Sequence, residues 1–493
     1  MSLPLPWSFP SPEAALVWII FIPILGALLY FLVGRNTPPW LVLSGVFLLW
    51  GLALLQITGA LTGSEAVQTN LGGWEPPLGI ALYADGLSAL MLWLTWLAGG
   101  GVGLYSLGYW RERTYRQYLF WCAFYILMGS LNALFVSADI FNLYITLELL
   151  TFGSIALISL AATTQAFHSG MRYLLYAMVG SIVYLLGVAL AYGGAGTLNV
   201  FMLGSQMDMG QPYAMLSLVL MSGGLLVKAA IFPLHFWLPP AHSSAPAPVS
   251  ALLSALVVKG ALYLLIRLWF WPYSELSGFA ISQILGGLGG AAVIYGSLQA
   301  LRQDRIKLIV AYSTVAQLGY MMLIFPLLIN AAWQGALYQV LSHGVAKAAL
   351  FLAVGNIIFI NGNDRLDGLR SLHPHLSLTL FAFAMAAVSI MGLPPSGGFL
   401  AKWLLLQGAL EMGQWWWALL MFAGGLLSAG YFFRIFRVTF SRGDSTDKEA
   451  CQVQASAPRL PLTMSGAPLV LAVIAIGLGF AGVPILHMTG GMP

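Results

Sequence analysis

The sequence predicts an all-α polytopic membrane protein with about fourteen transmembrane helices, and three observations support that prediction. Of the 493 residues, 59% are hydrophobic and only 7% are charged, whereas about 25% of the residues in soluble proteins are charged. The mean hydropathy is +0.86. Apolar residues also form runs of about 18 or more, as membrane-spanning helices require, and not the roughly 10-residue alternating segments of a membrane β-barrel. These features exclude a soluble enzyme.

Polar or Gly/Pro-rich breaks divide the chain into the predicted spans. No Lys or Arg precedes Arg35, so the first span lacks the basic region of a cleaved secretory signal, and we expect it to be retained. The predicted spans are 14–34, 40–61, 84–108, 117–136, 140–162, 171–193, 213–238, 246–271, 279–300, 306–328, 332–360, 376–406, 415–438 and 465–486.

The basic residues predict the orientation of these spans, because cytoplasmic loops carry an excess of Lys and Arg. Apart from four lysines embedded in apolar segments, only Arg267 lies near the opposite side when the N-terminus is placed outside. An even number of spans then puts both termini outside the cytoplasm, in a cell inner membrane, with the 439–464 loop inside. The residues on or near the predicted cytoplasmic side are Arg35, Arg111, Arg113, Arg116, Arg172, Arg302, Arg305, Lys307, Arg365, Arg370, Arg434, Arg437, Arg442, Lys448 and Arg459.

Proline clusters predict two helices that are broken at membrane depth. One run carries Pro233, Pro239 and Pro240, and the other carries Pro394 and Pro395. Paired interrupted helices indicate a transport site built from inverted repeats. We therefore expect two inverted five-helix repeats, each with one broken helix. The predicted units are the N-terminal helices 1–116, a first repeat 117–271, a second repeat 279–438, and the loop with the last helix, 439–493.

Four of the six lysines lie in otherwise apolar segments: Lys228, Lys259, Lys347 and Lys402. A lysine at the bilayer centre costs about 2.5 to 3.5 kcal/mol, so we expect these lysines to face the protein interior and to have a use. Glu148 is the acid deep within a span, and we predict that it pairs with Lys228. Such a pair can change its charge state when one partner moves; the alternative is a static pair that fixes helix packing.

The other titratable residues extend this candidate set. Lys259 has no obvious partner in sequence and fits a relay, with snorkelling to the interface as the alternative. His343 and Lys347 are four residues apart and share a helix face, which favours coupled titration over a structural histidine. Lys402 follows the second break, either as the last site of a proton path or as an interface lysine. His235 and His242 flank the first break and could extend that path toward water or serve as structural residues.

The residue pattern holds no sign of a cofactor. The histidines are scattered, and no HExxH or CxxC sequence is present. Cys122 and Cys451 are too few for a disulfide framework or a metal site. No basic patch for nucleic acid stands out. We therefore expect no cofactor, no metal and no nucleic-acid partner, and any redox chemistry would belong to other subunits.

Several ordered motifs resemble a known family. They are DIFNLYITLELL, KAAIFPLHFWLPPAHSSAPAPVSALLSALVVKGALYLLIR, DRIKLIVAYSTVAQLGYM, LSHGVAKAALFL and GLPPSGGFLAKW. Across roughly residues 70–440 they are similar to the antiporter-like subunits of respiratory complex I, membrane-bound hydrogenases and Mrp-type cation/proton antiporters. The early GGWEPPLGIALYADGLSALML most resembles the D-type subunits of Mrp-type Na+/H+ antiporters.

This resemblance implies roles for individual residues. Glu148 and Lys228 match the family's charge pair, Lys259 its central lysine, His343 and Lys347 its connecting residues, and Lys402 its terminal lysine. The resemblance also implies fourteen helices with two inverted five-helix repeats.

The function implied is a proton-translocating subunit of a multi-subunit Na+/H+ antiporter, with other membrane subunits, H+, Na+ and the lipid bilayer as partners. Two alternatives stay open. One is a pump subunit of a complex I-like or hydrogenase redox complex. The other is a membrane subunit of an energy-coupled inorganic-carbon uptake system. In each case the chain is a transporter subunit rather than an enzyme.

Overall fold

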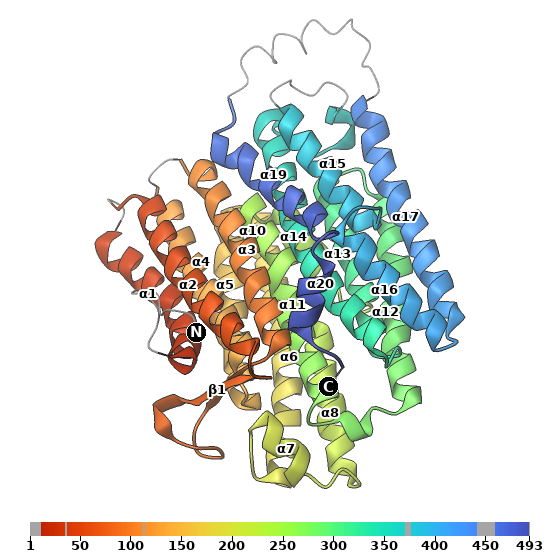
Figure 1. Cartoon of the computed structure of the whole chain (residues 1–493). Coiled ribbons are helices and arrows are strands. Elements are labelled where there is room, and N and C mark those ends of the chain that lie inside the picture. Colours follow the sequence, from red (N-terminus) through yellow and green to blue (C-terminus); the bar gives the residue numbers. More distant parts are fainter. Residues whose placement is uncertain (1–10, 35–36, 112–113, 370–375, 441–458, 493) are drawn as a thin grey trace, which may run out of the picture.

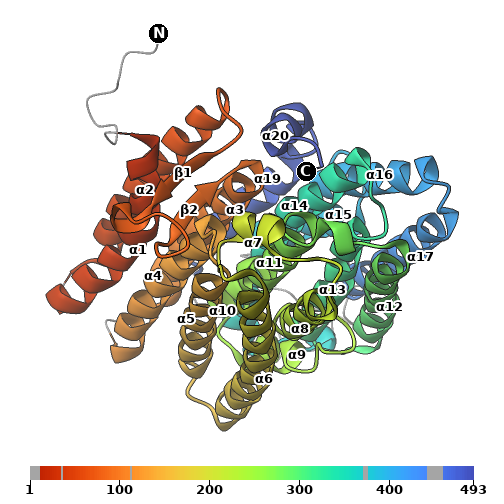
Figure 2. The ribbon, with the colours of Figure 1, turned by 90° about the horizontal axis from the view of Figure 1, so that it is seen from below.

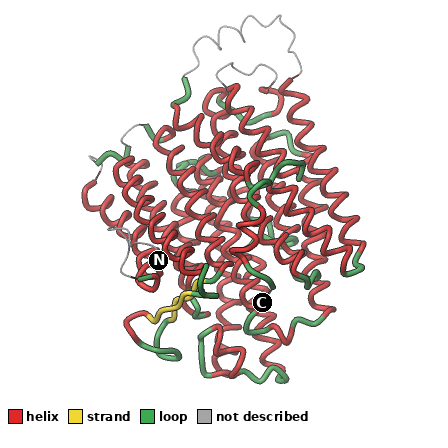
Figure 3. Tube along the Cα trace, viewed as in Figure 1, coloured by secondary structure: helices red, strands yellow, loops and turns green. Residues whose placement is uncertain are grey.

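The computed structural model describes residues 11–34, 37–111, 114–369, 376–440 and 459–492, and residues 441–458 of the predicted cytoplasmic loop lie outside them. Within the described part the chain is almost entirely helical (Figure 3). Two short strands, β1 (Val67–Asn70) and β2 (Ala81–Ala84), pair antiparallel. They lie between the second and third predicted spans, and four residues are too few for an alternating pattern to reveal a strand.

The described helices confirm the predicted all-α polytopic fold, and they can be matched to the predicted spans one by one. Eleven helices are long and apolar enough to cross a membrane, and a bent pair makes a twelfth. The remaining two spans are broken helices that begin with short apolar segments. Nine of the long helices are single α-helices: α1 (Pro12–Val33), α2 (Pro39–Leu61), α3 (Gly86–Tyr109), α4 (Tyr115–Val136), α5 (Ile140–Ser159), α6 (Thr164–Ala195), α12 (Phe279–Arg302), α14 (Asn330–Asn361) and α17 (Trp415–Phe440).

The other two long helices change their winding along their length. The first consists of α10 (Ala247–Leu252), the π-helical turn η3 (Leu253–Val257) and α11 (Val258–Phe270). The second consists of α13 (Ile306–Met321) and the 3-10 turn η5 (Met322–Ile324). A π-helical turn inside an α-helix is rare and is frequently found at functional sites.

Both predicted broken helices are present. α8 (Pro212–Lys228) is separated by a non-helical segment from α9 (Leu238–Ser244), and α15 (Ser377–Met391) is separated by another from α16 (Gly397–Glu411). Pro233 lies within the first unwound segment. Pro239, by contrast, stands in the first turn of α9, where the missing N–H removes no intrahelical hydrogen bond. Lys228 is therefore the last residue of a half-helix, and Lys402 lies within one.

The predicted single span at 465–486 is wrong in one respect. It consists of α19 (Leu462–Gly477) and α20 (Gly482–Thr489), which are bent by 81° at their junction. Gly479 lies at the bend, where a Cβ atom would stand 2.0 Å from the backbone oxygen of Pro395. The junction thus packs against the second broken helix. The sequence there is apolar throughout, so hydropathy could not reveal the bend.

A repeated pattern of backbone contacts relates the two halves. Asp139 and Asn199 form an isolated antiparallel bridge, and so do Arg305 and Arg365; positions 139 and 199 thus recur at 305 and 365, a shift of 166 residues. α6 and α14 both contain 32 residues. Each ends at a left-handed glycine, and these two residues, 196 and 362, show the same shift of 166.

The two copies run in opposite directions through the molecule. α7 (Val200–Gln206), which follows α6, lies at the lower end of Figure 1, whereas α15, which follows α14, lies near the upper end. The fold therefore contains the inverted repeats that the broken helices predict. The predicted repeat boundaries, 117–271 and 279–438, remain a prediction.

The centre of the bundle is formed by helices that include those of Lys259, His343 and Lys347, three of the six predicted site residues. Figure 2 shows α10, α11, α13 and α14 in the middle, with α1 and α2 at one edge and α12 and α17 at the other. The segment from Ala247 to Phe270 is buried throughout its most apolar part. The edge helices instead expose many large apolar side chains, as expected for surfaces that face lipid.

Candidate functional site

Glu148 and Lys228 form the predicted ion pair. Their side chains come from α5 and from the last residue of α8, and Lys228 Nζ lies 2.7 Å from Glu148 Oε1. Lys228 is only 6% exposed. The Ser181 hydroxyl on α6 donates to the same carboxylate oxygen, and Lys228 Nζ also lies 3.4 Å from the Thr151 hydroxyl. Three helices thus surround one buried positive charge and one carboxylate.

The helix break beside this pair is held by side-chain and backbone bonds. The Trp237 indole donates to the Val227 carbonyl at 2.9 Å, and the Ile231 amide donates to the Leu226 carbonyl at 3.1 Å. Ala230 has a positive φ of 54°, a conformation that costs a residue with a Cβ atom about 1 kcal/mol or more. The Leu226 and Val227 carbonyls at the end of α8 are therefore bonded without the Lys228 side chain. The ammonium group of Lys228 bonds Glu148 and Thr151 instead.

Lys259 is fully buried in α11, directly after the π-helical turn. Its Nζ donates to the backbone oxygen of Ser254, which belongs to that turn. The Ser254 hydroxyl lies 2.8 Å from the hydroxyl of Thr314. No carboxylate is within ion-pair distance among the described residues. Lys259 therefore makes no ion pair with a described residue, and its burial fits the predicted relay better than snorkelling to an interface.

His343 and Lys347 lie on α14, as predicted, but they bond to different surroundings. Lys347 Nζ donates to the Val310 carbonyl at 2.7 Å and to the Ser313 hydroxyl, both on α13. Both ring nitrogens of His343 are buried and, among the described residues, lack a hydrogen-bond partner. A buried nitrogen without a partner requires water or a rearrangement. Among the described residues, His343 is therefore held in place by packing and not by hydrogen bonds to protein groups.

His242 and His235 occupy the first broken helix. His242 is fully buried in α9, stacks on Phe351 of α14 with ring centroids 4.7 Å apart, and has no partner for either ring nitrogen within the described part of the chain. His235 lies in the unwound segment, 2% exposed, beside the rings of Phe232 and Tyr295.

Lys402 is held at the second break. Its Nζ donates to the carbonyls of Ile390 and Met391 at 2.8 and 3.1 Å, at the C-terminal end of α15. The ammonium group also lies 4.6 Å from the centre of the Tyr320 ring. A cavity of about 370 Å³ adjoins Lys402, lined mainly by apolar side chains of α16 and α17. The end of a half-helix carries partial negative charge, so it stabilises a cation at this position.

A polar face of α13 connects these separate lysines, and sequence inspection missed it. The signal was present as polar residues at positions i, i+1, i+4 and i+7 of an apolar helix, which place them on one side. The contacts of this face are Lys347 Nζ to Ser313 Oγ, Ser254 Oγ to Thr314 Oγ1, Gln339 Nε2 to Gln317 Oε1 at 2.7 Å, and Lys402 Nζ over the Tyr320 ring.

A second buried ion pair was also missed. Arg267 donates through two nitrogens to Asp85, at 2.6 and 2.7 Å, and to the hydroxyls of Ser88 and Tyr263, each at 3.0 Å. The sequence placed Asp85 at a span entrance and Arg267 near the outer side, but offered no reason to pair them across 182 residues. Arg267 is 3% exposed and lies in the last turn of α11. Lys307, predicted on a cytoplasmic loop, is likewise buried, at the start of α13.

Of the six predicted site residues, the structure brings only Glu148 and Lys228 into direct contact. The remaining four are each bonded to backbone or hydroxyl groups, or lack a partner. A proton could pass between them only through intervening polar side chains and water. Among the described residues no group of three or more His, Cys, Asp or Glu could hold a metal ion. The arrangement of buried lysines, histidines and hydroxyl groups suits the movement of protons.

Comparison with protein families finds a match over residues 137–428 to the family described as NADH:quinone oxidoreductase/Mrp antiporter, transmembrane. The chain is 33% identical to the N subunit of NADH-quinone oxidoreductase from Desulforudis audaxviator, over 87% of this chain and 86% of that protein. It is 30% identical to the D subunit of the Na(+)/H(+) antiporter from Alkalihalophilus pseudofirmus, over 95% of this chain and 94% of that protein.

Solved structures show the same fold. A chain of the Mrp complex from Dietzia sp. DQ12-45-1b matches with a TM-score of 0.86 and 24% identity, covering 97% of this chain and 96% of that chain. A chain of respiratory complex I from Thermus thermophilus matches with a TM-score of 0.75 and 26% identity, covering 96% of this chain and 100% of that chain. Both likenesses extend over nearly the whole length.

Proposed function

This chain belongs to the NADH:quinone oxidoreductase/Mrp antiporter transmembrane family, and from that premise we propose that it is the proton-translocating subunit of a multi-subunit Na+/H+ antiporter. The observation that supports this most is the buried Glu148–Lys228 pair beside a broken helix. An ion pair among apolar helices is costly to bury. Lys228 ends α8 beside an unwound segment, so a movement of that segment would change the distance between the two charges of the pair.

The proposed path runs from this pair toward the second break. Protons pass between Lys228 and Lys259, continue to Lys347 with His343 beside it, and reach Lys402. The polar face of α13 supports this route, since its hydroxyls contact Lys347 and the turn that holds Lys259, and its Tyr320 ring faces Lys402. Lysines suit this role because an ammonium group releases its proton when its surroundings change, whereas a guanidinium does not.

The antiporter role is favoured over a redox complex by coverage. A relative named as a D subunit of a Na(+)/H(+) antiporter extends over 95% of this chain, whereas the relative named as an N subunit of NADH-quinone oxidoreductase extends over 87%. The second candidate, a pump subunit of a redox complex, is supported by 33% identity to a protein named for NADH-quinone oxidoreductase. In either complex the proton path would be the same, and the other membrane subunits would determine what drives it.

The proposed location is the cell membrane with both termini outside the cytoplasm. The basic residues of the predicted cytoplasmic loops support this orientation through the positive-inside rule. An Asp444→Cys variant tests it, because position 444 belongs to the predicted cytoplasmic loop. In a background in which the native Cys451 of the same loop is replaced by Ser, a thiol reagent that cannot cross membranes should label this cysteine in inverted vesicles and not in intact cells. Labelling of intact cells would reverse the orientation.

Transport by a Glu148→Gln variant tests the function. Gln keeps the shape of Glu but loses the charge, so we expect Na+-dependent proton flux in inverted vesicles to fall at least tenfold with assembly intact. Glu411→Gln is the matched control, since Glu411 is an exposed acid that bonds only Gln407 among the described residues. Wild-type flux in Glu148→Gln would remove the pair from the path. Proton flux that requires quinone and not Na+ would favour the redox complex.

A further inference from the structure

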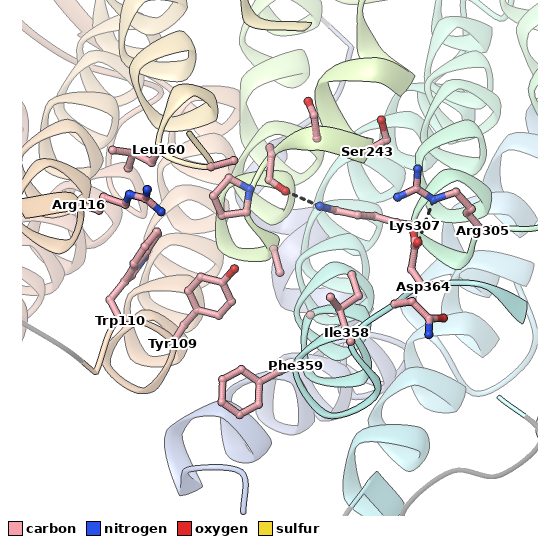
Figure 4. A pocket seen from close by; sticks show the side chains of 18 residues that line it. Tyr109, Trp110, Arg116, Leu160, Ser243, Arg305, Lys307, Ile358, Phe359 and Asp364 are labelled. Atoms are coloured by element: carbon pink, nitrogen blue, oxygen red, sulfur yellow. Dashed lines mark hydrogen bonds and ion pairs between the residues drawn. The ribbon is translucent and has the colours of Figure 1, made fainter. Parts of the chain in front are cut away.

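A cavity of about 640 Å³ lies in this protein, and none of the six residues of the proposed proton path lines it. One wall is formed by the junction of α3 and α4, with Trp110 and Arg116. The opposite wall is formed by the start of α13, with Arg305 and Lys307, and by Asp364 after α14 (Figure 4). The floor is formed by residues 243–247, where α9 meets α10.

The cavity is lined by more positive than negative charge. The lining contains three basic side chains, those of Arg116, Arg305 and Lys307. It contains one carboxylate, Asp364, which accepts a hydrogen bond from Arg305 Nε at 2.8 Å. The two terminal nitrogens of Arg305 have no hydrogen-bond partner in the described part of the chain, and its side chain is 42% exposed. Arg116 is exposed and makes no ion pair with any described residue. Within the described part of the chain, two guanidinium groups thus keep free donors at the cavity.

Lys307 adds a fixed charge behind these arginines. It is 5% exposed, and its Nζ donates to the carbonyl of Ala245 at the end of α9. This bond holds the ammonium group at the floor of the cavity. A charge buried this far without a carboxylate in contact favours an anion nearby.

The rest of the lining is aromatic or apolar. Tyr109, Trp110, Ile358 and Phe359 border the cavity on the side away from Ser243 (Figure 4). Tyrosine and tryptophan are typical of the depth of lipid headgroups. Basic pockets between transmembrane helices bind phosphate-bearing headgroups, and the volume lies within the range of small-molecule sites.

We propose that this cavity binds a phosphate-type oxyanion, with Arg116 on one wall and Arg305 on the other as its ligands. Planar guanidinium groups match phosphate oxygens in two-point contacts. An anion between them would connect the N-terminal helices to the second repeat. The phosphate group of an anionic phospholipid and free inorganic phosphate share this chemistry, and the experiment separates them.

Thermal unfolding of the full-length chain, purified with its co-purifying subunits in detergent, provides the test. Dihexanoyl-phosphatidylglycerol, dihexanoyl-phosphatidylcholine and inorganic phosphate are titrated separately. We expect the anionic lipid to raise the unfolding temperature at lower concentration than the zwitterionic lipid. In an Arg116→Gln/Arg305→Gln variant its half-maximal concentration should rise about thirtyfold, since each basic residue near an anionic headgroup contributes about fivefold in affinity.

The control variant removes two arginines elsewhere, Arg172→Gln/Arg437→Gln, both exposed and outside the cavity lining. It should titrate like the wild type. If inorganic phosphate acts as strongly as the anionic lipid, and only the cavity variant loses the response, the site stands and its ligand is free phosphate. Equal titration by the cavity variant and the wild type, or an equal loss in the control, overturns the site.

A single variant, Arg116→Gln, covers the case that the double variant does not fold, because Arg116 is exposed. This variant should weaken the response about fivefold.

Discussion

The two buried ion pairs found among the described residues differ in how fully their charges are bonded. Arg267 binds both oxygens of Asp85, two hydroxyls, and the face of Trp271 at 4.3 Å. Asp85 also accepts from the Ser88 amide at the start of α3. In the other pair, Lys228 and Ser181 both bond the same oxygen of Glu148. The Asp85–Arg267 pair is thus surrounded by several hydrogen-bonding groups, whereas the Glu148–Lys228 pair has few such partners.

This difference separates a structural pair from one that can switch. A guanidinium stays protonated at any physiological pH and requires its partner to stay in place. A lysine at the end of a half-helix can lose its proton or its partner when the unwound segment moves. Burial is nearly the same in both pairs, with Arg267 3% and Lys228 6% exposed. The kind of cation and the number of its bonds therefore distinguish the two roles better than burial does.

The largest expected effect on stability is that of Asp85→Asn. Removing the carboxylate leaves the buried Arg267 charge unpaired, a loss of about 3 to 5 kcal/mol. We expect a strong fall in folded yield and in the unfolding temperature of the purified protein. Asp367→Asn, at an exposed acid, should change neither. A stable Asp85→Asn protein would mean that the Arg267 pair does not hold α3 to α11, and the contrast between the pairs would fail.

Lys402→Arg should remove transport but not assembly. Arginine keeps the positive charge at the end of α15, yet it does not release a proton, so Na+-dependent proton flux should fall at least tenfold. Lys402→Glu tests the same point from the other side, since a carboxyl group still titrates in a wet cavity and should retain partial flux. Flux at the wild-type rate in Lys402→Arg, with matched expression, would show that the residue supplies only a fixed charge.

A smaller effect is expected on the polar face of α13. Gln317→Leu removes an amide that bonds Gln339 between the central lysines and Tyr320, and we expect proton flux to fall severalfold. Tyr320→Phe keeps the ring that faces Lys402 and should change flux less than twofold. Proton flux through the two variants, measured in vesicles prepared in the same way, shows which side chain matters more. A larger loss in Tyr320→Phe than in Gln317→Leu would mean that the phenol hydroxyl, rather than the amide pair, carries the connection.

Much of the fold could be predicted from the sequence, because apolar runs, prolines and basic residues report directly on spans and breaks. The Lys228–Glu148 pair was predictable for the same reason: Glu148 was the one acid found deep in a span. The Asp85–Arg267 pair was not, since both residues stand near span ends and their contact joins distant helices. Hydropathy also could not reveal the bend at Gly479 or the burial of Lys307, because tertiary packing determines both.

Proton flux per assembled complex in two reciprocal variants, Lys228→Arg and Arg267→Lys, tests the central claim most directly. The account predicts that Lys228→Arg assembles with nearly wild-type stability and transports nothing, because the charge is kept but can no longer be released. It predicts that Arg267→Lys is less stable but transports at nearly the wild-type rate per assembled complex. Wild-type flux in Lys228→Arg together with lost flux in Arg267→Lys would contradict it and exchange the roles of the two pairs.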